Sequence, residues 1–142
     1  MNRRINIPSR ISDIRYAVDE VLALLKEIKA EESVVFDIRL SLEEALINAI
    51  KYGNRFDERL SVDIDFLHND NKVTITVEDK GGGFDYNGIP DPTKEDNLLK
   101  SKGRGIFLIR HLMDNVEYNE KGNRIIMTKY LRKENSPTHK GR

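Results

Sequence analysis

The glycine-rich run at residues 79–85 holds the residue types best suited to chemistry in this sequence. It reads DKGGGFD and follows an alternating strand pattern, so Asp79 arrives at the end of a strand. Consecutive glycines fit a sharp turn or a place where the backbone approaches a ligand closely. Asp79 is then a candidate buried acceptor for the amino group of adenine, with Gly81 and Gly83 allowing the close approach. The alternative is a turn acid that caps local amides.

A carboxylate and an amide, Glu44 and Asn48, stand four residues apart on a predicted helix, one above the other. An Asn side-chain oxygen is a hard ligand that suits Mg²⁺, which keeps waters and bridges phosphates. A carboxylate beside that metal can orient or deprotonate a nucleophile. Both residues fall on the flank away from the apolar stripe of the helix, so a solvated surface is the alternative interpretation.

A second pair of glycines, Gly103 and Gly105, flanks Arg104 just before an apolar helical pattern that begins at Ile106. Glycines at a helix start expose its unpaired N–H groups, and the helix dipole there favours an anion. Arg104 and Lys102 could add contacts to a phosphate. The alternative is a flexible helix start with basic residues on the surface.

Three helices and a set of short strands must position these residues. The expected elements are a strand at 5–7, helices at 9–29 and 33–52, strands at 61–66 and 73–78, a helix at 103–113, and strands at 116–118 and 125–131. We expect Ser9 to cap the first helix and Gly53 to end the second. The strands have one apolar face each, which predicts an α+β fold, a two-layer sandwich whose mixed, mostly antiparallel sheet carries about three helices on one face. Residues 84–102 form a long loop, of the kind that is usually a lid or disordered.

Composition excludes other kinds of chemistry. The absence of cysteine excludes disulfides, thiolate metal sites and a cysteine nucleophile. The 24 basic and 24 acidic residues balance, which gives no argument for binding nucleic acid or acidic membranes. No segment approaches the roughly 18 apolar residues of a membrane span, and no apolar stretch follows the basic N-terminus. We expect a cytoplasmic protein with one domain at 1–131 and a disordered polar tail at 132–142.

The order and spacing of the three segments resemble the GHKL ATP-binding superfamily, which includes gyrase, Hsp90, histidine kinases and MutL. Residues 44–49 (EALINA) resemble its N-box, residues 79–84 (DKGGGF) its G1 box, and residues 103–106 (GRGI) its G2 box. The resemblance covers about residues 5–131 and is closest to the stand-alone RsbW/SpoIIAB-like anti-sigma factor serine/threonine kinases. It implies the Bergerat ATP-binding fold, with ATP and Mg²⁺ as cofactors.

The resemblance also implies roles for individual residues. Glu44 would be the general base, and Asn48 would bind Mg²⁺. Asp79 would contact adenine, while the segment Gly103–Ile106 would wrap the phosphates. One position departs from the pattern, because Tyr52 stands where family members often have histidine. A tyrosine cannot carry a positive charge, which puts a phosphate or acid–base role at that position in doubt.

For function, the resemblance implies an ATP-dependent protein serine/threonine kinase that is also an anti-sigma factor. Its partners would be a STAS-type antagonist and a sigma factor, and a homodimer would use the exposed first strand and helix. A histidine kinase is disfavoured, because none of His68, His111 and His139 lies early on a helix beside an acid. Gyrase-like and MutL-like proteins need a transducer domain, for which the expected elements leave no residues.

Three alternatives to the kinase remain open at this point. The chain could be a nucleotide-dependent binding module without catalysis, or an ATPase that uses water as the acceptor. It could also be an α+β domain whose glycines are purely structural.

Overall fold

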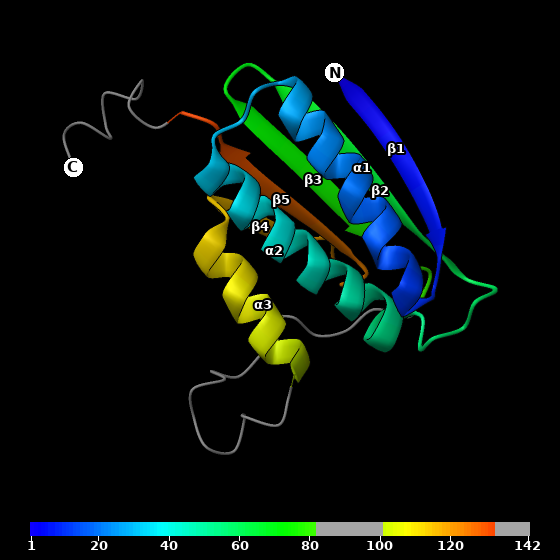
Figure 1. Ribbon diagram of the computed structural model, residues 1–142. Helices are drawn as coiled ribbons and strands as arrows, with labels where there is room; N and C mark the ends of the chain where they lie inside the picture. Colours follow the sequence, from blue (N-terminus) through cyan, green and yellow to red (C-terminus); the bar gives the residue numbers. More distant parts are fainter. Residues whose placement is uncertain (82–100, 133–142) are drawn as a thin grey trace.

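The computed structural model describes residues 1–81 and 101–132 of the chain. The loop expected at 84–102 lies outside the described residues except at its end, where the backbone already belongs to a helix. Gly83 and, apart from Arg132, the expected tail also lie outside them. The described residues form two layers, a sheet and a set of helices packed on one of its faces (Figure 1).

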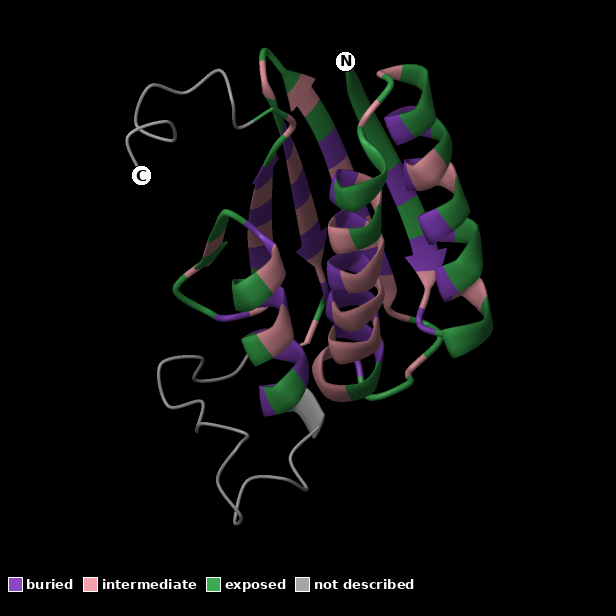
Figure 2. Cartoon of the chain, turned by 60° about the vertical axis from the view of Figure 1, so that its left-hand side comes forward, coloured by how far each residue is buried: buried purple, intermediate pink, exposed green. Residues whose placement is uncertain are grey.

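The sheet is antiparallel throughout the described residues. Its strands are β1 (Asn2–Pro8), β2 (Ser61–Asn69), β3 (Lys72–Glu78), β4 (Asn115–Tyr118) and β5 (Arg124–Tyr130), in the order β1-β2-β3-β5-β4. Buried and more exposed positions alternate along them, visible as bands in Figure 2, because successive side chains point to opposite faces. The expected α+β class is confirmed. The prediction allowed for a mixed sheet, whereas all of the described pairings are antiparallel.

The helical layer consists of α1 (Ile14–Glu27), α2 (Glu32–Asn48) and α3 (Ser101–Leu112). Figure 1 shows α2 between the other two helices, and α1 packs toward β1 while α3 packs toward β4. In the part of the chain that the structure describes, no helix is long and apolar enough to cross a membrane.

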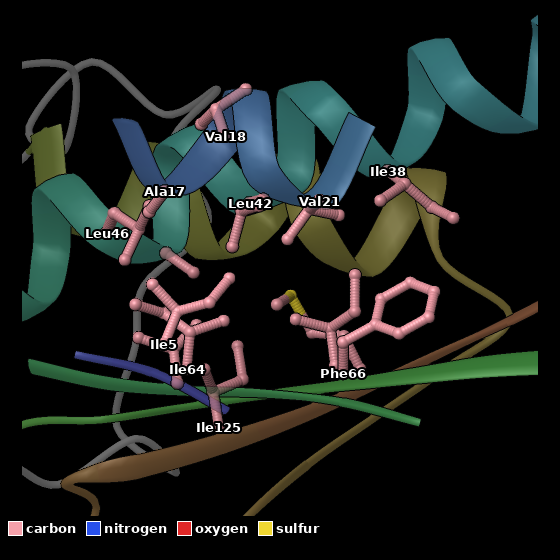
Figure 3. Close-up of a cluster of buried hydrophobic side chains, with 14 of the residues drawn as sticks. Ile5, Ala17, Val18, Val21, Ile38, Leu42, Leu46, Ile64, Phe66 and Ile125 are labelled. Atoms are coloured by element: carbon pink, nitrogen blue, oxygen red, sulfur yellow. The ribbon is translucent and has the colours of Figure 1, made fainter. Parts of the chain in front are cut away.

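A single apolar core fills the space between sheet and helices. In Figure 3, Ile64 and Phe66 of β2 point toward Leu42 and Leu46 of α2, and all four side chains are 0% exposed. Burying a side chain of this size contributes about 1.5–3 kcal/mol. The core therefore fixes α2 against the sheet, and α2 is the helix that carries the expected acid–amide pair.

The first two helices differ from expectation at their ends. Ser9 does not cap a helix, because a 3₁₀ turn at Ile11–Asp13 precedes α1 and has Arg10 at its cap position. The second helix stops being regular at Asn48, where it continues as a π turn at Ala49–Gly53. Isolated π turns often occur at functional sites, because they redirect the chain within a helix.

Candidate functional site

Asp79 follows directly after the end of β3 and is 7% exposed. Its Oδ1 accepts a hydrogen bond from the backbone N–H of Gly81 at 2.8 Å. Its own backbone N–H donates to the carbonyl oxygen of Asn123 at 3.0 Å, and its carbonyl accepts from Nδ2 of Asn123 at 2.9 Å. The turn between β4 and β5 therefore fixes the backbone of Asp79, and Gly81 holds its buried carboxylate.

The π turn packs against Asp79 so closely that two positions have room only for glycine. A Cβ atom added at Gly53 would overlap the carboxylate of Asp79, and one added at Gly81 would overlap the carbonyl oxygen of Gly53. Gly53 therefore does more than end a helix, which was the only role that the sequence suggested for it. The acid, Gly53 and Gly81 form one tightly packed unit.

Asn54 ties this unit to the rest of the sheet. Its side chain is 2% exposed, and its Nδ2 donates to Oγ of Ser9 at 2.8 Å and to the carbonyl oxygen of Ser61 at 3.1 Å. Its Oδ1 accepts from the backbone N–H of Lys80 at 2.8 Å. The hydroxyl of Ser9, which donates to the carbonyl oxygen of Leu60, is thus part of this network and not a helix cap.

A pocket opens above Asp79, between α2 and the sheet. Its walls are mostly apolar or aromatic, with one buried carboxylate and a few amides. The lining residues are Ala45, Asn48, Ala49, Tyr52, Gly53, Val77, Asp79, Tyr118, Gly122, Asn123 and Ile125. Burial raises the pKa of the Tyr118 phenol above its ordinary value, so this group stays uncharged over a wider range of pH. An apolar slot with one convergent acceptor suits a flat ring that carries an amino group.

Glu44 and Asn48 do not lie on a solvated flank of α2. Both are only partly exposed, because they face the first half of α3. A Cβ atom added at Gly105 would lie 2.6 Å from Oε1 of Glu44 and 3.2 Å from Nδ2 of Asn48. Glycine at position 105 therefore makes room for the acid–amide pair.

A second groove follows this contact along the surface between α2 and α3. It is lined by Glu44, Ile47, Asn48, Lys51, Arg104, Gly105 and Leu108. Asn48 lines both this groove and the pocket above Asp79, so the two adjoin at that residue. The pair of cations in the groove, Lys51 and Arg104, suits an anionic group placed next to the slot for a flat ring.

The surroundings of Glu44 act against its negative charge. Burial raises the pKa of its carboxyl group, and the neighbouring Glu43 raises it further, whereas Arg104 lowers it. The net shift is upward. A carboxylate with a raised pKa is a stronger base than an ordinary glutamate, which matches the expected role in proton transfer.

The start of α3 differs in detail from the expectation. The helix begins at Ser101, so Gly103 and Gly105 lie inside its first turns. Arg104 is exposed beside the groove, while Ile106 is 0% exposed and belongs to the interior. Ile106 can therefore reach a ligand only through its backbone. The side chain of Lys102 is outside the described part of the chain.

Comparison with known proteins decides the family. Residues 7–129 match the histidine kinase-like ATPase domain. The chain belongs to this family. It is similar to the serine-protein kinase RsbW of Staphylococcus aureus strains MSSA476 and MW2, at 36% identity over 106 residues, which is 69% of this chain and 67% of each relative. The resemblance to the GHKL superfamily and to its RsbW-like members is confirmed.

A solved structure supports the same fold. A crystal structure of the RsbU and RsbW domains of a Mycobacterium tuberculosis protein matches with a TM-score of 0.62 at 19% identity. The match covers 93% of this chain and 32% of the other, so this chain spans about a third of that protein's length. At this identity the likeness bears on the fold alone.

Within this histidine kinase-like ATPase domain, several site residues were missed by sequence reasoning. Lys51 had a usable signal, since it follows Asn48 by three residues on the same side of the helix. Tyr118 and Asn123 had none, because only the pairing of β5 with β3 brings their hairpin to Asp79. Asn54 directly follows the glycine expected to end the second helix, and its hydrogen bonds to Ser9 and Lys80 join segments that are distant in sequence.

The donor set fits a magnesium ion shared with a ligand. Among the described residues no group of three or more His, Cys, Asp or Glu side chains could hold a metal. Asn48 carries one hard amide oxygen, and its Nδ2 lies with Oε1 of Glu44 beside the space that a Cβ at position 105 would fill. Mg²⁺ typically takes one or two side chains and completes its shell with phosphates and water. The amide oxygen of Asn48 is thus sufficient only when a phosphate ligand is also present.

Proposed function

We propose that this chain is an ATP-dependent protein serine/threonine kinase and anti-sigma regulatory factor, which phosphorylates a STAS-type antagonist. The observation that carries the proposal is the contact of Glu44 and Asn48 with Gly105, next to the pocket that ends at Asp79. The similarity to RsbW serine-protein kinases supports the same reaction. The proposal implies a sigma factor as second partner, a homodimer and a location in the cytoplasm.

The pocket and the groove together define how ATP would be oriented, with adenine in the pocket and the phosphates in the groove. Adenine would enter the slot between α2 and the sheet, where Asp79 accepts a hydrogen bond from its amino group. The triphosphate would then run past Asn48 into the groove between α2 and α3. Lys51 and Arg104, with the first-turn N–H groups of α3, would offset its negative charge.

The residues of the groove would act on the acceptor serine. Glu44 would take the proton from the serine hydroxyl while the serine oxygen forms a bond to the γ-phosphorus of ATP. The bond between that phosphorus and the β,γ-bridging oxygen breaks, and ADP leaves. Mg²⁺ held by Asn48 together with the phosphates would neutralise charge on the transferred group. Positioning and electrostatic stabilisation dominate such a transfer.

The direct test is phosphotransfer to a purified STAS-type antagonist, followed by the mass added to that protein. Glu44→Gln keeps the size of the side chain and removes the base, so we expect transfer to fall by about 100-fold or more. ATP binding, measured by calorimetry, should persist. Glu32→Gln, at an exposed position in the first turn of α2, is the matched control and should keep wild-type activity.

The same experiment separates the alternatives. ATP binding without transfer to antagonist or water would support the non-catalytic binding module. Release of phosphate in the absence of an acceptor, lost in Glu44→Gln, would support an ATPase acting on water. No heat on ATP titration would reject nucleotide binding altogether.

A further inference from the structure

Lys129 of β5 is a buried cation that the proposed chemistry does not use. Its side chain is 6% exposed, and its Nζ lies 2.9 Å from Oδ2 of Asp37. The same ammonium donates to the carbonyl oxygen of Leu112 at 2.6 Å. Asp37 belongs to the first half of α2, and Leu112 is the last residue of α3. One charge therefore joins the sheet to both helices that form the groove.

The buried ammonium of Lys129 does more than fill space, because burying a charge is energetically unfavourable. Removing such a group from water is unfavourable unless it is paired and hydrogen-bonded, and an apolar side chain often serves the fold equally well. Here the ammonium has both an ion-pair partner, Asp37, and a hydrogen-bond acceptor, the carbonyl oxygen of Leu112. The carbonyl of Leu112 is among those that lack a partner within the helix, and a cation there matches the helix dipole.

The ion pair and the proposed active site lie at opposite ends of the same helix contact. Asp37, Glu44 and Asn48 follow one another at spacings of seven and four residues, which places them on one side of α2. Gly105, near the start of α3, meets the far end of that stripe, while Leu112 meets Asp37 through the ammonium. The two helices, side by side in Figure 1, are therefore antiparallel.

We propose that Lys129 is a positioning residue that fixes the C-terminal end of α3 on α2 and thereby sets the place of Gly105 against Glu44. α3 has 12 residues, which is about 18 Å at a rise of about 1.5 Å per residue. A tilt of about 5° about its C-terminal end moves its start by about 1.5 Å. A misplacement of about 1 Å near a reacting group can cost about 100-fold in rate.

Two measurements test the proposal, and the kinetic one rests on the proposed kinase function. Lys129→Met keeps the length of the side chain and removes the charge. We expect kcat for transfer at saturating ATP to fall about tenfold or more, while the affinity for ADP changes less than about twofold, because the adenine pocket is untouched. Lys129→Arg, which keeps a cation, should recover part of the loss. Lys26→Met, on the exposed side of α1, is the matched control.

The second measurement does not depend on activity. The chain has no cysteine, so spin labels can be placed at Phe36→Cys on α2 and Phe107→Cys on α3, both exposed positions. Pulsed electron paramagnetic resonance should give a narrow distance distribution in the otherwise wild-type chain. Lys129→Met should broaden it, and a tilt of about 5° would shift its mean by about 0.7 Å, because Phe107 lies about 7.5 Å from the C-terminal end of α3.

The outcomes separate this inference from the proposed function. Absence of transfer by the wild-type chain would reject the kinase and leave the distance measurement as the test of positioning. An unchanged distance together with unchanged kcat in Lys129→Met would overturn the role of Lys129. If that variant does not fold, Asp37→Asn, whose side chain is 25% exposed, takes its place under the same criteria.

Discussion

Glu44 is a residue whose charge the fold disfavours. Because burial raises its pKa, the folded chain binds this proton more tightly than the unfolded chain does. The resulting contribution to stability is present at low pH and is lost as the pH rises through the raised pKa. Keeping the group ionised at neutral pH therefore lowers the free energy of unfolding, which is consistent with the role in proton transfer proposed for Glu44.

Ionisation of Glu44 should therefore raise activity and lower the stability of the fold. The logarithm of kcat/KM should rise with pH along a limb that lies above the range of an ordinary glutamate, because only ionised Glu44 accepts the proton. Glu44→Gln should lose that limb and should unfold at a higher temperature than wild type at neutral pH. Rate profiles and thermal unfolding followed by circular dichroism measure the two effects. A limb that survives in Glu44→Gln would assign the titration to another group.

Gly105→Ala tests whether the close approach of α3 serves chemistry. The added methyl group would meet Oε1 of Glu44, the movable end of a side chain, so the fold can adjust easily. Alanine in place of glycine inside a helix contributes up to about 1 kcal/mol of stability. We expect unchanged or higher thermal stability with transfer reduced about tenfold or more, because the carboxylate is displaced. Phe107→Ala, at an exposed position on the same helix, is the control; equal activity of the two variants would contradict the assignment.

At the residue scale, the sequence predicted site residues where a chemically suitable residue type also occurs at a suitable spacing. Asp79, Glu44, Asn48 and Gly105 were singled out by residue type and by distance along the chain, and the structure brings Glu44, Asn48 and Gly105 together. Their roles stay predictions. Gly53 was predicted only as a helix end, because its close contact is with a carboxylate that is distant in sequence, and no local pattern records such a contact.

At the scale of elements, Asn54 connects three segments that must be in register for Asp79 to be in place. It bonds Ser9 after β1, Ser61 at the start of β2 and Lys80 after β3. Without the Asn54 side chain, the Ser9 hydroxyl, the Ser61 carbonyl and the Lys80 N–H would each lose a hydrogen bond at a buried or partly buried place. The side chain thus replaces backbone pairing where the strands have already ended.

Asn54→Ala should therefore reduce both stability and nucleotide affinity. Leaving buried polar partners unsatisfied costs about 1–3 kcal/mol, and the freed backbone at Lys80 no longer fixes the loop that contains Gly81. Urea unfolding measures the first effect as a lower midpoint with an unchanged slope, and calorimetry with ATP measures the second. Asn6→Ala is the control, because Asn6 is exposed although it also bonds Ser61. Equal losses in the two variants would deny Asn54 a special role.

Helices and strands were predictable from periodicity, and their ends were not. The apolar stripe of α2 and the alternation in β2 and β3 follow from local patterns that burial imposes. The π turn at Ala49–Gly53 packs against Asp79, which is distant in sequence, so no local pattern predicts this contact. Ser9 has the residue type of a helix cap, but its hydroxyl is engaged by Leu60 and Asn54.

At the scale of the whole molecule, the strand order decides what meets Asp79. β3 pairs with β5, which places the β4–β5 turn next to the end of β3. Alternation along the sequence predicts which face of a strand is buried, but it does not predict which strand is its neighbour. The pocket wall made by Tyr118, Gly122 and Asn123 is therefore a property of the assembled sheet.

Because the pocket joins both layers, its occupation should stabilise the whole chain. At a free ATP concentration of about 100 times Kd, linkage adds about 2.7 kcal/mol, which raises the midpoint of thermal unfolding by about 10 °C for a chain of this size. GTP presents an acceptor where ATP presents the amino donor, so two oxygen acceptors would face each other at buried Asp79. We expect GTP at the same concentration to give a far smaller shift, measured by scanning calorimetry. Asp79→Asn, which can donate as well as accept, should narrow the difference between the two nucleotides. Equal stabilisation of the wild-type chain by ATP and GTP would remove Asp79 from base recognition.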